Sequence, residues 1–187
     1  MQSTTPYDYS QVRVLVVDDN VHMCRLVRAM LGGFGIRQVA DASDGAEALE
    51  RMDQGQFDVL VVDWEMPVLD GAEFVRMVRN PDHPYCYAPI IMITGHSTYR
   101  RTQEALALGV NDVLCKPFST QALYARFIDN VIDPRPFVRS ADYFGPKPRL
   151  TKAERDPLAV SPKTNAASND QGMRDASIDL DELATIE

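Results

Sequence analysis

Between residues 11 and 132, the chain alternates short apolar runs with longer stretches in which apolar residues recur every three or four positions. The short runs are rich in β-branched residues and predict five strands, at 12–17, 36–40, 57–62, 90–93 and 112–115. The periodic stretches predict five helices, at 21–31, 44–52, 71–79, 98–108 and 119–131, the last with Ser119 as its N-cap. The first helix is expected to bury an apolar face made of Val21, Leu26, Val27, Met30 and Leu31.

Strands and helices that alternate in this way favour an α/β fold, a parallel sheet with helices packed on both of its faces. The nearly continuous apolar strands agree with this, because a parallel sheet is buried on both sides. In such folds, ligands bind at the carboxyl ends of the strands, near the point where the strand order reverses. Any chemistry is therefore expected from polar residues that follow the strands.

Polar residues directly follow four of the predicted strands. Asp18 and Asp19 follow the first strand, Asp63 the third, Thr94 the fourth and Lys116 the fifth. Carboxylates that converge in one crevice repel each other, so either a pKa rises or a cation neutralises them. Hard oxygen ligands with room for water suit Mg²⁺, and the aspartates therefore predict a divalent-cation site.

The other two residues at the strand ends suggest phosphoryl transfer. Lys116 is a point charge suited to a carboxylate or a phosphoryl oxygen, and Thr94 can donate a hydrogen bond to an anion. An aspartate can itself be the nucleophile and form an acyl phosphate. Each residue alone is better explained as a helix cap or a loop residue, but together they match the components of phosphoryl transfer.

The segments that contain these residues are similar to a known family. VLVVDDN, VLVVDWEMPVLDG, IIMITGHS and DVLCKPF resemble the four signature blocks of response-regulator receiver domains, most closely those of the chemotaxis-regulator kind. The resemblance covers residues 11–132, the whole predicted receiver domain. It implies a flavodoxin-like, doubly wound, five-stranded parallel sheet in the order 2-1-3-4-5 with five helices. A largely irregular tail over residues 133–187 would follow.

The resemblance also implies which residues bind the metal ion and accept the phosphoryl group. Asp63 would be the phosphoacceptor. Mg²⁺ would be held by Asp18, Asp19, Asp63 and the backbone carbonyl of Glu65. The donor would be a phosphohistidine on a sensor histidine kinase or a histidine phosphotransfer protein. The chain would then be a switch that catalyses only its own phosphorylation and dephosphorylation.

Further residues of the signature blocks would surround the phosphoryl group. Thr94 would bond it, and Lys116 would pair with Asp63 or its phosphate. The bond between Lys116 and Pro117 is an X–Pro bond, the class to which cis peptide bonds are almost wholly confined. The loop after the phosphoacceptor would be shaped by Met66-Pro67 and Gly71.

Val113 departs from the family pattern. Receiver domains usually carry tyrosine or phenylalanine three residues before this lysine, and that ring swings inward with the threonine on activation. A β-branched aliphatic residue cannot make the same rotamer change. Movement of the Thr94 loop and of the following helix would then carry the signal.

Three neighbours of the site complete the prediction. Glu65 and His96 lie two residues beyond the phosphoacceptor and the threonine, where the family tunes the rate of phosphoryl loss to water. His96 either positions water or stands in solvent, and we favour solvent. Trp64 directly follows the phosphoacceptor and is expected to pack at the lip of the crevice.

Composition narrows the class of protein. The chain has 187 residues, 45% of them hydrophobic and 25% charged, which is ordinary globular composition. Its formal charge of −8 disfavours indiscriminate nucleic-acid binding. Cys24, Cys86 and Cys115 lack CxxC spacing and predict free thiols in a cytoplasmic protein. Neither a signal peptide nor an apolar stretch of the ~18 residues that span a membrane is expected.

Beyond residue 132 the helical periodicity stops, and the sequence suggests no output domain. Phe137, Tyr143 and Phe144 either pack back on the domain or form a recognition peptide. Residues 150–174 have the composition of a disordered segment. Residues 176–186 place apolar side chains at helical spacing among acids, and form either a short docking helix or an acidic terminus.

Three functions compete at this point. The leading one is a phosphorylation-dependent signalling switch whose output passes to an unidentified downstream protein. The second is a constitutive protein-interaction module with the receiver fold, in which phosphorylation is secondary, and Val113 is its main support. The third is a phosphatase-like or other flavodoxin-like enzyme with an aspartate nucleophile, which no substrate motif supports. Nucleic-acid and membrane partners are not expected.

Overall fold

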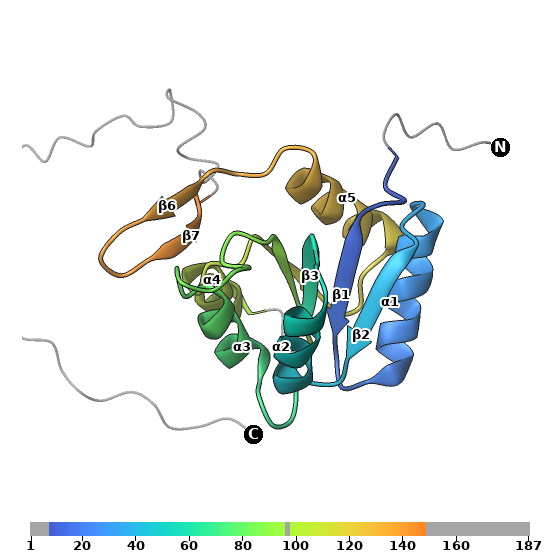
Figure 1. Cartoon of the computed structure of the whole chain (residues 1–187), viewed down its shortest axis with the longest axis horizontal. Helices are drawn as coiled ribbons and strands as arrows, with labels where there is room; N and C mark the ends of the chain where they lie inside the picture. Colours follow the sequence, from blue (N-terminus) through green and yellow to red (C-terminus); the bar gives the residue numbers. More distant parts are fainter. Residues whose placement is uncertain (1–7, 96–97, 149–187) are drawn as a thin grey trace, which may run out of the picture. The chain divides into compact units, whose positions relative to one another are not determined.

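The computed structural model of the chain describes residues 8–95 and 98–148. Its main sheet has five parallel strands in the order β2-β1-β3-β4-β5, which confirms the predicted fold (Figure 1). The strands are β1 (Arg13–Val17), β2 (Gln38–Ala42), β3 (Val59–Asp63), β4 (Ile90–Thr94) and β5 (Asp112–Cys115). The helices that follow them in turn are α1 (Val21–Gly33), α2 (Gly45–Gln54), α3 (Gly71–Val78), α4 (Tyr99–Ala107) and α5 (Thr120–Val131).

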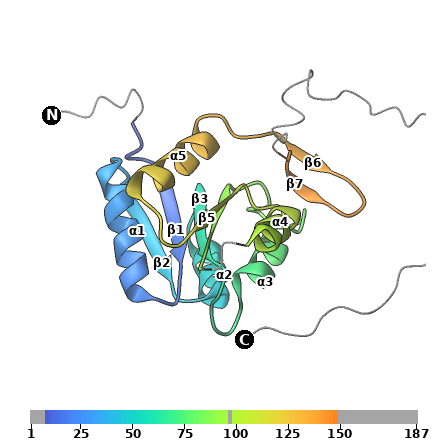
Figure 2. The ribbon, with the colours of Figure 1, turned by 180° about the vertical axis from the view of Figure 1, so that it is seen from behind.

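Helices cover both faces of the main sheet (Figure 1; Figure 2). On one face pack α1 and α5, whose side chains Val27 and Phe127 are fully buried. On the other face pack α2, α3 and α4, which bury Met52, Phe74 and Ala105. Successive residues of each central strand alternate between these two cores, which explains why the strands read as continuous apolar runs.

The second strand lies two residues later than predicted, at Gln38–Ala42 rather than 36–40. Ile36 is instead buried after α1, where its backbone N–H donates to the carbonyl of Leu31 at 3.2 Å. Gly35 allows this turn because its φ is 92°. β2 is an edge strand with several partly exposed residues, so its apolar signal is weaker than that of the central strands.

The buried face of α1 also differs from the predicted one. Cys24, Val27 and Leu31 are buried, whereas Val21 and Leu26 are 58% and 46% exposed. Successive helix residues are about 100° apart, so Leu26 lies on the far side of the helix from Cys24. Val21 is the first residue of the helix. The segment therefore contains more apolar residues than the face that packs on the sheet can bury.

Strong capping fixes where several helices begin. Ser119 caps α5 as predicted, since its hydroxyl accepts a hydrogen bond from the backbone N–H of Ala122 at 3.1 Å. Asp70 and Glu73 form a reciprocal capping box at the start of α3. The start of α3 therefore has a defined position directly after the β3–α3 loop.

Val68 in the β3–α3 loop occupies a strained backbone conformation, with φ of 65° and a side chain that is 84% exposed. Left-handed backbone costs a β-branched residue about 1–2 kcal/mol, whereas asparagine tolerates it better. We expect Val68→Asn to raise the free energy of unfolding by about 1 kcal/mol. Urea denaturation measures this, and an unchanged or lower value would show that the loop stores no such strain.

A two-stranded antiparallel hairpin follows α5, formed by β6 (Phe137–Arg139) and β7 (Phe144–Pro146) and drawn in orange in Figure 1. The rings of Phe137 and Phe144 lie 5.2 and 5.5 Å from that of Tyr87, which precedes β4. Tyr143 donates its hydroxyl to the carbonyl of Pro146 at 2.7 Å. Of the two alternatives for these aromatic residues, the structure thus favours packing back on their own domain. The strands themselves were not predicted.

The division into a receiver at 11–132 and a tail at 133–187 stays a prediction. The segments 150–174 and 176–186, for which disorder and a short helix were considered, lie outside the described residues. Within residues 8–95 and 98–148, no helix is long and apolar enough to cross a membrane.

Candidate functional site

The parallel sheet brings the predicted polar residues to one edge. Asp18 and Asp19 directly follow β1, and Asp63 is the last residue of β3. Thr94 is the last residue of β4, and Lys116 directly follows β5. Because all five strands run the same way, their carboxyl ends lie at the same side of the sheet. The strand order reverses between β1 and β3, where ligand sites of this fold class occur.

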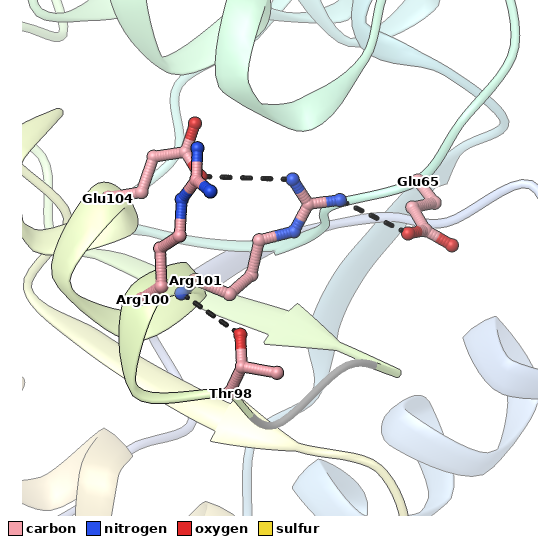
Figure 3. Close-up of a pocket in the computed structure, with 5 residues that line it drawn as sticks. All are labelled: Glu65, Thr98, Arg100, Arg101 and Glu104. Atoms are coloured by element: carbon pink, nitrogen blue, oxygen red, sulfur yellow. Dashed lines mark hydrogen bonds and ion pairs between the residues drawn. The ribbon is translucent and has the colours of Figure 1, made fainter.

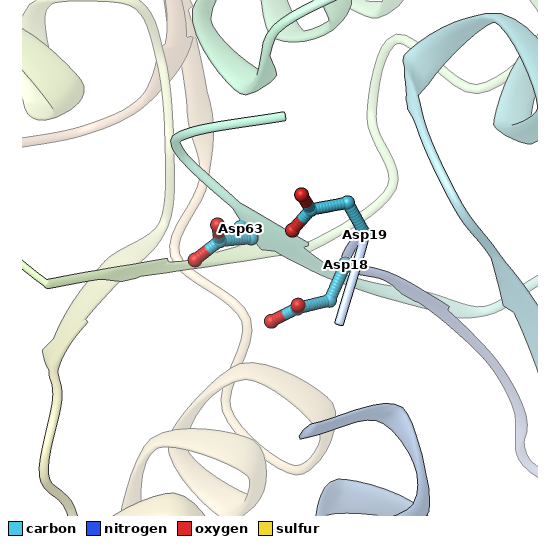
Figure 4. Close-up of side chains that lie close together, drawn as sticks. All are labelled: Asp18, Asp19 and Asp63. Atoms are coloured by element: carbon cyan, nitrogen blue, oxygen red, sulfur yellow. The ribbon is translucent and has the colours of Figure 1, made fainter. Parts of the chain in front are cut away.

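Three carboxylates form a compact cluster at the ends of β1 and β3. Ligand oxygens of Asp18, Asp19 and Asp63 all lie within 4.8 Å of one another, and the side chains point into the same space (Figure 4). Asp18 and Asp63 are only 3% and 5% exposed, whereas Asp19 lies open to solvent. An oxygen-only ligand set with one solvent-facing member fits Mg²⁺, which keeps several waters in its coordination shell.

Lys116 joins the two buried carboxylates. Its Nζ lies 2.7 Å from Oδ1 of Asp63 and 3.1 Å from Oδ2 of Asp18. The backbone N–H of the lysine donates to the carbonyl of Thr94 at 2.8 Å, which fixes the chain after β5. The peptide bond between Lys116 and Pro117 is cis. The lysine is thus held against both buried carboxylates.

The charges at the site are not balanced. Burial raises the pKa of Asp63, and the charge of Asp18 adds to this, while the hydrogen bond from Lys116 acts in the opposite direction without cancelling them. Burial alone would lower the pKa of Lys116, but its bonds to the two aspartates outweigh burial and raise that pKa. The site therefore holds one ammonium, that of Lys116, beside three carboxylates. A bound divalent cation would neutralise the excess negative charge.

Thr94 and Val113 lie deeper at the same edge. Thr94 is 1% exposed and pairs across the sheet with Cys115. Val113 is half-buried, pairs with Met92 and packs against the core beneath α4. The β-branched side chain therefore fills the position where the family usually has a ring, and it fills it as a packing residue.

The loop after Asp63 is folded tightly against the strand. The backbone N–H of Gly71 donates to the carbonyl of Trp64 at 3.0 Å. A Cβ atom on Gly71 would lie 2.2 Å from the carbonyl oxygen of Asp63, so only glycine fits there. Trp64 is 4% exposed and belongs to the core on the α2–α4 face, and Met66 packs against that core. Trp64 therefore packs as expected, although it lies in the core and not at an exposed lip of the crevice.

Arg101 of α4 is a neighbour of the site that the sequence did not predict. Its guanidinium carbon lies 4.3 Å from the centre of the Trp64 ring, and its Nη2 lies 3.2 Å from Oε1 of Glu65. Its Nη1 lies 3.9 Å from Oε2 of Glu104 (Figure 3). No sequence signal identifies a contact between residues 36 positions apart. A pocket of about 420 Å³ at this place is lined by Glu65, Thr98, Arg100, Arg101 and Glu104.

The geometry does not test two further predictions about the carboxyl-terminal edge of the sheet. The backbone carbonyl of Glu65 remains a predicted Mg²⁺ ligand. The two alternatives for His96, water positioning and plain solvent exposure, lie outside the described residues.

Comparisons with known proteins agree with this geometry. The family model for the response regulator receiver domain matches residues 14–128. The chemotaxis protein CheY of Pseudomonas aeruginosa is 37% identical over 112 residues, which are 60% of this chain and 90% of that protein. The chemotaxis protein CheY1 of Helicobacter pylori is 38% identical over 113 residues, 60% of this chain and 90% of its own length.

Solved structures give the same result. The structure of Vibrio cholerae chemotaxis protein CheY4 superposes with a TM-score of 0.57 and 36% identity, covering 62% of this chain and 95% of that one. The receiver domain of Francisella response regulator 1452 gives a TM-score of 0.57 and 32% identity, covering 62% and 93%. Both likenesses cover 62% of this chain and more than nine tenths of the other chain.

Proposed function

Since the chain belongs to the response regulator receiver domain family, we propose that it is a phosphorylation-dependent switch that accepts a phosphoryl group on Asp63. The observation that carries this proposal is the pair of contacts from Lys116 to Asp63 and Asp18, at 2.7 and 3.1 Å, beside the three-carboxylate cluster. A buried nucleophile, a charge-compensating ammonium and a cation site are the components that phosphoryl transfer to a carboxylate requires.

In the proposed reaction, an oxygen of Asp63 attacks the phosphorus of a phosphohistidine. A P–O bond forms as the P–N bond breaks, and the histidine nitrogen leaves with its electron pair. Asp18, Asp19, Asp63 and the backbone carbonyl of Glu65 would hold Mg²⁺, which when bound neutralises charge on the phosphoryl oxygens.

Lys116 and Thr94 act on the product of this transfer. The ammonium of Lys116 moves from the carboxylate to a phosphoryl oxygen, because the negative charge then lies on the phosphoryl oxygens and no longer on the carboxyl group. The hydroxyl of Thr94 donates a hydrogen bond to the same group. Water later hydrolyses the acyl phosphate, so the chain catalyses only its own phosphorylation and dephosphorylation.

The proposed partners follow from this chemistry. The donor is a sensor histidine kinase or a histidine phosphotransfer protein, and the output is a contact with a downstream protein. Cys24, Cys86 and Cys115 are free thiols, which supports a cytoplasmic location as part of the proposal.

A constitutive interaction module is the second candidate, and the half-buried Val113 is the observation that favours it. Its side chain packs against the core and cannot make the inward swing of a ring. In that case the chain would bind its partner equally well with and without a phosphoryl group.

The test of the proposed function is a titration of Trp64 fluorescence with Mg²⁺, followed by beryllofluoride as a phosphoryl mimic. Trp64 is the only tryptophan and adjoins Asp63, so its emission reports on this site alone. We expect a change on adding Mg²⁺ and a second change on adding beryllofluoride. The variant Asp63→Asn should lose the second change and take up no phosphoryl mass from acetyl phosphate. A wild-type chain that also takes up no phosphoryl mass would leave the constitutive module as the better description.

Removal of the site's ammonium should strengthen metal binding. In Lys116→Met the carboxylates lose a competing cation within hydrogen-bond distance, and we expect the Mg²⁺ dissociation constant to fall by about 3- to 10-fold. The same variant should show a smaller response to beryllofluoride, because the mimic has lost its cationic partner. The matched control is Lys147→Met, whose side chain is exposed on the hairpin, and its Mg²⁺ affinity should equal that of the wild type. Equal affinities in both variants would show that Lys116 does not act on the metal site.

A further inference from the structure

Arg101 ties the first turn of α4 to the two residues that follow the phosphoacceptor. Its guanidinium stacks on Trp64 with 4.3 Å between the charge centre and the ring centre, and it pairs with Glu65 at 3.2 Å. Only 31% of its side chain is exposed, so the contacts are partly shielded from water and salt. Glu104, one turn further along α4, holds the other side of the guanidinium at 3.9 Å (Figure 3).

The same turn of α4 is connected to the phosphoryl sensor. Thr94 ends β4, and Thr98 begins α4 as its N-cap only four residues later. The hydroxyl of Thr98 accepts a hydrogen bond from the backbone N–H of Arg101 at 3.2 Å. A displacement of this first turn on phosphorylation would therefore move the base of the Arg101 side chain.

Arg101 cannot keep all its contacts through such a movement. The ring of Trp64 is held in the core, at 4% exposure, and is joined covalently to Asp63. The guanidinium must therefore either hold α4 in place or leave the ring. In the arrangement described here Lys116 contacts the Asp63 carboxylate itself, at 2.7 Å, which identifies this arrangement with the unmodified aspartate.

We propose that Arg101 is a positioning residue that holds α4 against the loop after Asp63 in the unmodified chain and is released on phosphorylation. Its contacts with Trp64 and Glu65 would supply the two-state element that Val113 does not. The proposal rests on the proposed function and adds the device by which phosphorylation would reach α4. A contact present in only one of two states sets their populations and so changes the apparent affinity of any ligand that selects the other state.

The test is the beryllofluoride concentration that half-saturates the Trp64 signal of the full chain at saturating Mg²⁺. This midpoint is informative because it does not depend on the direct effect of a neighbouring cation on the intensity of Trp64. We expect Arg101→Met to lower the midpoint by about 3- to 10-fold, because the mimic no longer has to break the contacts of Arg101. The midpoint of Arg101→Lys should fall between those of the wild type and Arg101→Met, since lysine keeps the charge but loses the planar stacking group.

Arg100→Met is the matched control. Arg100 precedes Arg101 on the same turn, is exposed and lines the same pocket, so its removal makes the same change in net charge. Its midpoint should equal that of the wild type. Equal midpoints in Arg101→Met and the wild type overturn the inference, and so does an equal shift in both arginine variants, which would mark a general charge effect. A wild-type chain without any Asp63-dependent response overturns the proposed function and this inference together.

Discussion

Gly71→Ala is expected to lower the free energy of unfolding by about 3 kcal/mol and to slow phosphorylation of Asp63. The added Cβ would lie 2.2 Å from the carbonyl oxygen of Asp63 and 3.1 Å from the Cα of Trp64. Both atoms belong to backbone, which cannot rotate aside as a side chain would. Either α3 must move away from the sheet or the end of β3 must shift, and the second change displaces the nucleophile itself.

The capping box of Asp70 and Glu73 makes the first response costly. It fixes the start of α3, and the backbone N–H of Gly71 already donates to Trp64. Urea denaturation measures the loss of stability, and mass spectrometry after incubation with acetyl phosphate measures the loss of phosphorylation. Gly33→Ala is the control, because a Cβ at Gly33 meets no atom within 4 Å. It should leave stability unchanged or raise it by about 0.5–1 kcal/mol. If the two alanine variants behave alike, the contact between α3 and Asp63 is looser than described.

The sequence was sufficient for the main sheet because a parallel sheet leaves a simple signal. The central strands are buried on both faces and appear as continuous apolar runs, so their positions and the α/β class could be predicted. The edge strand β2 was misplaced by two residues because Ile36, a buried apolar residue in the turn after α1, resembled the start of a strand. The strands that are buried on both faces thus gave a clearer apolar signal in the sequence than the partly exposed edge strand β2 did.

The polar residues of the site could be predicted from the sequence equally well. In a parallel sheet, residues that follow the strands must meet at one side, so Asp18, Asp63 and Lys116 could be expected together without knowledge of any distance. The structure adds that Lys116 contacts both aspartates and that only Asp19 of the acidic cluster is open to solvent.

Contacts made by helix and hairpin side chains could not be predicted in the same way. Arg101 meets Trp64 because of the rotation of α4 about its own axis, which tertiary packing sets. The hairpin strands have three residues each, too few to show a period. Their aromatic residues meet Tyr87, about 50 positions earlier in the chain, and no local pattern encodes such a contact.

Arg79→Met should be the most damaging substitution away from the site, lowering the free energy of unfolding by about 3–4 kcal/mol. Arg79 is 5% exposed and donates to the carbonyls of Gly109 at 2.8 Å and Cys86 at 2.9 Å and to Oδ1 of Asn111 at 3.0 Å. Burial lowers its pKa to about 10, so the group remains charged at neutral pH. Methionine can fill the space but donates nothing, and the buried carbonyls lose these donors.

Urea denaturation of full-length variants tests this expectation. Arg76→Met is the control, because Arg76 lies one turn earlier on α3 with its side chain exposed. It should change the free energy of unfolding by no more than about 0.5 kcal/mol. Equal losses for Arg76 and Arg79 would show that the buried hydrogen bonds add nothing beyond the general effect of removing a charge.

Arg79 also contacts the hairpin, because its guanidinium carbon lies 5.1 Å from the ring centre of Phe137. Substitutions at this contact therefore test whether the hairpin unfolds together with the rest of the domain. In addition, a Cβ on Gly109 would lie 2.6 Å from the carbonyl oxygen of Phe144, so β7 packs directly on the turn that Arg79 supports. The losses from Arg79→Met and Phe137→Leu should therefore be non-additive, with a coupling of about 0.5–1 kcal/mol in a double-mutant cycle. Additive losses would mean that the hairpin unfolds independently of α3 and β5. Coupled losses would mean that residues beyond α5 stabilise the sheet that carries the phosphoacceptor.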